Sequence, residues 1–111
     1  MDVIEFSAEQ ARQIQSFSSV AARSVALAHG HGESHVYAIA IAPGGSIGAH
    51  EAGFDQLFLI VRGSGWASGA DGAKHPLREG QGAFIRKGEL HAKGSDAGLL
   101  AIMVQASEFS T

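Results

Sequence analysis

Residues 44–63 carry side chains that could bind a metal ion or a polar ligand. This stretch, GGSIGAHEAGFDQLFLIVRG, places two such residues beside the most apolar run of the chain. If the backbone is extended from His50 onward, successive side chains point to opposite faces. One face then carries His50, Ala52, Phe54, Gln56 and Phe58. Because imidazole nitrogens and amide oxygens can pair with a cation or with an organic group, this face is predicted to hold a site.

Two other patterns could also do chemistry. Residues 44–48, GGSIG, match the G-x-S-x-G nucleophile elbow, but that elbow needs a strand running into a helix of a larger α/β sheet, and β structure follows here. His29, His31 and His35 form an H-x-H-x3-H cluster that could chelate a metal. The neighbouring glycines favour a solvated loop instead, although His35, at the start of a strand, could reach a cavity mouth.

The elements that would position these residues are short strands separated by glycine-rich turns. The chain has fifteen glycines, and no stretch has the spacing of a long helix. Strands are predicted over residues 3–6, 23–28, 35–42, 54–61, 66–68, 74–78, 83–86 and 99–105. Turns are expected at HGHGES, at RGSG and at the hairpin signal Asp71-Gly72.

The pattern predicts an all-β fold, a single antiparallel β-barrel or jelly roll with at most one short N-terminal helix. A capping box of Ser7 and Gln10 could start that helix, and an irregular arm crossing the barrel is the alternative. Residues 1–22 are assigned to an arm or edge segment and residues 23–111 to one barrel domain, because a chain of 111 residues is enough for one core.

Composition excludes several classes of function. The net charge of −3 does not favour binding to nucleic acid or to an anionic membrane. No apolar run is long enough for a membrane helix. Without cysteine, disulfides and thiolate ligands are impossible. No charged-then-apolar leader begins the sequence, so a cytoplasmic protein is expected.

Residues 44–63 and 80–95 resemble the two motifs of the cupin superfamily of small β-barrels. The first cupin motif is a glycine, five residues, His-x-His, three or four residues, Glu, six residues and a glycine. Gly44, His50, Gln56 and Gly63 fall on its positions. The second motif is a glycine, five residues, Pro-x-Gly, two residues, His, three residues and Asn. Gly80, Gly88 and His91 match it, with Arg86 and Ser95 in the proline and asparagine places.

This resemblance implies a divalent metal at His50, Gln56 and His91, but half of the family's ligand set has changed. Ala52 stands where the second histidine would be, and Gln56 replaces the glutamate. A neutral amide is a poorer donor than a carboxylate, so zinc, nickel, iron or manganese would bind more weakly. The alternative is a metal-free, hydrogen-bonded polar patch that holds an organic ligand. No organic cofactor is expected.

The resemblance also implies a small polar metabolite bound in the barrel by a homodimer. Isomerases, dioxygenases, decarboxylases and lyases occur in the family, so the reaction and the catalytic residues stay open. A storage or ligand-binding cupin without catalysis is the alternative, and an interaction module with a filled barrel is a third. The pocket walls are predicted to be Phe54, Phe58, Trp66, Phe84 and Met103, and Arg86 could meet an anionic substrate.

Overall fold

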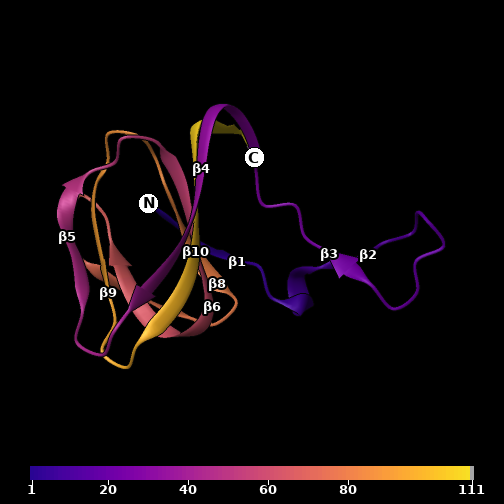
Figure 1. Cartoon of the computed structure of the whole chain (residues 1–111), viewed down its shortest axis with the longest axis horizontal. Coiled ribbons are helices and arrows are strands. Elements are labelled where there is room, and N and C mark those ends of the chain that lie inside the picture. Colours follow the sequence, from indigo (N-terminus) through magenta and orange to yellow (C-terminus); the bar gives the residue numbers. More distant parts are fainter. Residues whose placement is uncertain (111) are drawn as a thin grey trace.

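The computed structural model describes residues 1–110, which form an antiparallel β-barrel with an arm projecting from one side (Figure 1). A single turn of 3-10 helix, η1, covers Ala8–Gln10. The strands are β1 (Asp2–Glu5), β2 (Arg12–Gln13), β3 (Arg23–Ser24), β4 (His29–Ile41), β5 (Ser46–Glu51), β6 (Asp55–Ser68), β7 (Lys74–Arg78), β8 (Gln81–Ile85), β9 (Leu90–Gly94) and β10 (Leu99–Ser110). The predicted all-β class is confirmed.

β6 connects the two halves of the barrel. Its first part pairs with β8 and β10 in the sheet β1-β8-β6-β10-β4, and its second part pairs with β7 and β9. The break predicted at RGSG is therefore wrong, because the strand bends there and continues. Gly63 has a φ of +82°, and a Cβ atom at this position would collide with the backbone oxygen of Gly98. Only glycine permits this bend.

Alternation along the strands creates two apolar layers. The inner cluster fills the barrel and includes Phe58, Ile60, Ala83, Ile85 and Ala101, all fully buried. A second cluster lies on the other face of the same sheet and consists of Leu57, Phe84, Ala106 and Phe109. The strand predicted over residues 35–42 overlaps β4, where Ile39 and Ile41 pack into the inner cluster.

The first third of the chain departs from the sequence predictions in two details. The one short N-terminal helix that the fold prediction allowed is present as η1, but Ser7 makes no side-chain capping bond. The turn predicted at HGHGES is instead the start of β4, because β10 pairs with β4 as far as His29. The pairing is irregular at this point: β10 has a bulge between Ala106 and Glu108, and Gly32 of β4 has a φ of +84°.

Several smaller expectations hold. The Asp71-Gly72 turn joins β6 to β7, with a φ of +73° at Gly72 and the backbone N–H of Ala73 donating to the Asp71 carboxylate at 3.0 Å. Ser46 begins β5 and no helix follows it, so the nucleophile elbow is absent as expected. No helix within residues 1–110 is long and apolar enough to cross a membrane.

The arm comprises residues 7–26 and extends away from the barrel, whereas one alternative from the sequence was a segment crossing it (Figure 1). Leu27 and Ala28, which follow the arm, pack against the second apolar cluster. β2 and β3 pair with each other and with no other strand. The radius of gyration is 14.6 Å, against about 13 Å for a compact chain of this length. β1, which precedes the arm, adds an edge strand to the barrel through β8.

Candidate functional site

Two histidines face each other across β5 and β9. His50 and His91 are directly opposite in the register, and their ring centroids are 4.3 Å apart. His50 is exposed, whereas His91 is 1% exposed. The Nδ1 atom of His50 lies 2.8 Å from the carbonyl oxygen of Gly48. Since a carbonyl only accepts, this Nδ1 carries the proton and Nε2 is left to accept or to coordinate.

Lys93 adds an unexpected cation to the site. It follows His91 by two residues on β9 and so points to the same face. Lys93 is 1% exposed, and its Nζ donates a hydrogen bond of 2.6 Å to Oε1 of Gln56. The same Nζ lies 3.9 Å from Met103 Sδ and 5.0 Å from the centroid of Phe58. Polar and apolar groups thus meet at one buried ammonium.

The polar residues continue across the sheet. Gln105 on β10 is the register partner of both Gln56 and His35, so the three side chains share the inner face. His35 contacts the edge of Phe54, with ring centroids 5.3 Å apart, and its Nε2 lies 2.6 Å from a Glu33 oxygen. Two residues before Gln105 on the same face of β10, Met103 is the register partner of both Phe58 and Tyr37. Tyr37 is 45% exposed.

Burial shifts two titratable groups. Loss of water lowers the pKa of His91 from 6.5 to about 4, with further lowering by the charges of Lys93 and His50 and an opposing effect of Glu89. His91 is therefore neutral at pH 7. Burial also lowers the pKa of Lys93 from 10.5 to about 8. Lys93 is then still largely protonated at pH 7.

His91 is incompletely paired. Neither ring nitrogen has a hydrogen-bond partner among the described residues, although both are inaccessible to solvent. Leaving a buried polar group unpaired costs about 1 to 3 kcal/mol. Such a group in a native structure calls for a ligand, a water molecule or an ion.

His50 and Gln56 are not on one strand, contrary to the sequence prediction. β5 ends at Glu51 and β6 begins at Asp55, so residues 52–54 interrupt the extended run. The backbone of Ala52 bonds instead to Glu89 at 3.0 Å and to Gly88 at 2.7 Å. Ala52 is 4% exposed and packs in the inner cluster.

The predicted wall residues separate into four places. Phe58 and Met103 lie beside Lys93, and Phe54 contacts His35. Trp66 lies further along β6, where it pairs with Gly94 in the register and Lys74 Nζ is 4.3 Å from its ring centroid. Phe84 lies in the second cluster, on the outer face of the sheet. The Arg86 guanidinium is 4.7 Å from the centroid of the Phe84 ring and so lies on the same face.

Sequence reasoning missed Lys93, Gln105 and Tyr37. The alternation that was applied to residues 50–58 applies equally to β9, where an inward His91 requires an inward Lys93. A lysine, however, is seldom fully buried, so its type favoured a surface position. Gln105 became apparent only through its pairing with Gln56.

The donor set fits a divalent metal poorly. Within residues 1–110 no three His, Asp or Glu side chains converge as a metal site. A metal bound to Gln56 Oε1 at about 2.1 Å would lie within about 4.7 Å of the Lys93 ammonium, because Nζ is 2.6 Å from the same oxygen. At an effective dielectric constant of about 20, that repulsion is about 7 kcal/mol, close to the free energy of micromolar binding. Metal occupancy stays a prediction, and Lys93 opposes it.

Comparison with known proteins defines the class of fold. No protein-family model and no curated protein matches the sequence. Among solved structures, a cupin-like protein from Thermotoga maritima is similar with a TM-score of 0.63 and 21% identity, covering 67% of this chain and 57% of that chain. An RmlC-like cupin from Shewanella frigidimarina gives 0.63 and 18%, covering 68% of each chain. A predicted oxalate decarboxylase from Thermotoga maritima gives 0.57 and 25%, covering 62% of each.

The molecule is a jelly-roll β-barrel, and its fold is that of the cupins. The resemblance predicted from the two motifs is thereby confirmed. The chain spans less than two thirds of the length of two of these three proteins.

Proposed function

We propose that this cupin binds a small polar metabolite at the inward-facing residues His50, Gln56, His91 and Lys93. The observation that carries the proposal is the buried His91 imidazole, whose two nitrogens have no partner in the described chain. A ligand hydrogen-bonded to His91 would remove a cost of about 1 to 3 kcal/mol per nitrogen. Met103, which is only partly buried and lies beside Lys93, supplies an apolar contact for the rest of a small molecule.

Ligand-dependent thermal stability tests this function. A panel of small carboxylic acids and polyols is added to the wild type, to His91→Leu and to His75→Leu, whose histidine is exposed on β7. A ligand at 100 times its Kd stabilises the folded state by about 2.7 kcal/mol. We expect at least one compound to raise the Tm of the wild type and of His75→Leu but not that of His91→Leu. An equal response of all three proteins would contradict the proposal.

A second candidate function is proton transfer on the bound molecule. The neutral His91 imidazole, with its pKa lowered to about 4, and the exposed His50 form a pair of acid–base groups in contact. Isomerisation and lyase chemistry need such groups. Exchange of substrate C–H protons with D2O, abolished in His50→Gln and His91→Gln, would support it.

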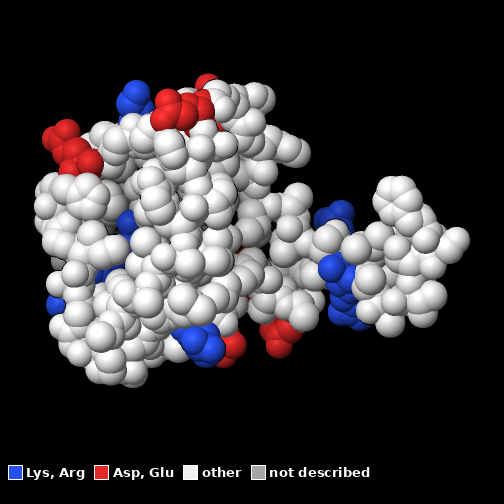
Figure 2. Space-filling model, in the orientation of Figure 1, with Lys and Arg blue, Asp and Glu red and all other residues white. Residues whose placement is uncertain are grey.

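We also propose that a homodimer forms through the arm of residues 7–26. The chain exposes 6551 Å², whereas a monomer of its mass typically exposes about 5,800 Å². The excess of about 750 Å² is close to the area of about 800 Å² that each partner buries in a standard interface. Phe17 is 94% exposed and Val20 85% exposed. Residues 14–22 contain no charged side chain, and the end of the arm is correspondingly white in Figure 2.

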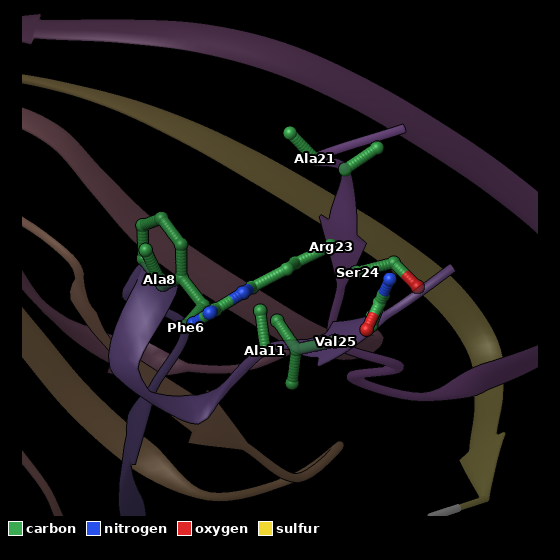
Figure 3. Close-up of a pocket in the computed structure, with 9 residues that line it drawn as sticks. Phe6, Ala8, Ala11, Ala21, Arg23, Ser24 and Val25 are labelled. Atoms are coloured by element: carbon green, nitrogen blue, oxygen red, sulfur yellow. The ribbon is translucent and has the colours of Figure 1, made fainter. Parts of the chain in front are cut away.

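The base of the arm is hollow as well. A cavity of about 630 Å³ is bordered by Phe6, Ala8, Ala11, Arg23 and Val25, as Figure 3 shows. Apolar side chains of a second copy could fill it. Light scattering coupled to size exclusion should give twice 11.5 kDa for the wild type and for Leu90→Ser, and 11.5 kDa for the double variant Phe17→Ser, Val20→Ser. A monomeric wild type at all concentrations would refute the dimer.

A further inference from the structure

We infer that Lys93 supplies, as a built-in side chain, the positive charge that a divalent ion would otherwise bring to this barrel, and that the ligand is therefore a small carboxylate. This inference rests on the proposed binding function and names its ligand class. It is carried by the position of Lys93 Nζ on the oxygen of Gln56, one of the predicted metal ligands.

The Lys93 ammonium has no anionic partner in the described chain. The ion pairs formed by residues 1–110 involve Met1 with Glu89, His35 with Glu33, and Arg78 with Glu5. Lys93 bonds only to a neutral amide oxygen and a thioether sulfur. An ammonium has three N–H donors, and a buried charge without a counter-ion is costly. A carboxylate ligand would satisfy both needs.

The surroundings suit the carboxylate of a small organic acid. His91 is buried with both nitrogens free, so one of them can donate a second hydrogen bond to the same group. Gln105, on the strand beside Gln56, provides a further amide in the inward row. Met103 is only partly buried, lies next to the ammonium and would contact a short carbon chain.

The first test asks whether Lys93 excludes metal. Binding of Zn²⁺ and Mn²⁺ is measured by calorimetry and elemental analysis on the double variant Ala52→His, Gln56→Glu and on the triple variant that adds Lys93→Met. We expect the triple variant to bind roughly 100-fold more tightly or better, because the repulsion of a second cation is gone. Equal affinities would overturn the inference, as would stoichiometric, high-affinity Zn²⁺ in the wild type.

The second test asks whether Lys93 binds anions. Acetate and oxalate are the anionic probes, glycerol is the neutral probe, and binding is followed by Tm and by chemical shifts of the His91 imidazole. We expect the acids to bind the wild type and to bind Lys93→Met at least 10-fold more weakly. Lys74→Met, which removes an exposed lysine beside Trp66, is the matched control and should behave as wild type.

The outcomes separate this inference from the binding function itself. If glycerol binds and the acids bind equally to wild type and Lys93→Met, the inference fails while the binding function stands. If no probe of either kind binds the wild type, both fail. Should Lys93→Met not fold, Lys93→Gln keeps an N–H donor for Gln56 while removing the charge, and the same comparisons decide.

Discussion

The pKa of His91 predicts how stability changes with acidity. Folding lowers this pKa from 6.5 to about 4, mainly because the buried imidazole loses water. Between these pH values the unfolded chain therefore binds more protons at His91 than the folded protein does. Stability must then rise with pH from about 4 to 6.5, and this contribution is lost as the pH falls through the same window.

The magnitude follows from the two values. Each pH unit is worth about 1.4 kcal/mol for one proton, so the full difference between 6.5 and about 4 corresponds to about 3 kcal/mol. The figure applies with little reduction for solvent, since His91 is 1% exposed. The positive charge of Lys93, and His50 when protonated, reinforce the effect, and Glu89 opposes it.

Urea unfolding measured at pH steps from 4 to 7 would check this prediction. Carboxylates titrate in the same range, so the decisive quantity is the slope for the wild type minus the slope for His91→Leu. We expect the wild type to lose about 3 kcal/mol more than the variant between pH 6.5 and 4. Parallel curves for the two proteins would refute the claim that the folded protein holds His91 neutral.

Three further perturbations have expected outcomes. Because the folded pKa of Lys93 is about 8 and the unfolded value 10.5, stability should rise between these pH values, and Lys93→Met should remove that rise in urea unfolding. Gly94→Ala should cost about 1 to 3 kcal/mol of stability, because the added methyl would meet the Trp66 ring at 2.6 Å or closer, which near-ultraviolet dichroism would report. Asp55→Ala should cost about 3 kcal/mol, because its carboxylate accepts the Phe109 N–H at 3.0 Å, and Asp55→Asn should cost less in the same unfolding assay.

Local pattern predicted much of the fold. Lys74–Arg78 was predicted with its exact bounds, because a hairpin turn precedes it and glycine follows it. The strands predicted over residues 35–42 and 54–61 overlap β4 and β6, since a period of two is a local property. His50 and His91 were selected from their positions in the two motifs, and their ring centroids lie 4.3 Å apart.

Long-range pairing determined the rest. The interruption at residues 52–54 depends on bonds from Ala52 to Glu89 and Gly88, which local sequence does not encode. HGHGES belongs to β4 because β10 lies beside it. Lys93 was overlooked for a related reason: its burial depends on Gln56, which lies 37 residues away in sequence.

The strand order also constrains how the protein is made. β10 lies between β6 and β4, so the sheet cannot be completed until Leu99–Ser110 has been synthesised. Until then β4 has no partner in its sheet, and β1 must wait for β8. A chain of this topology exposes unpaired strand edges throughout synthesis, when association with other nascent chains is most probable. C-terminal truncation should therefore release an aggregating chain rather than a smaller barrel.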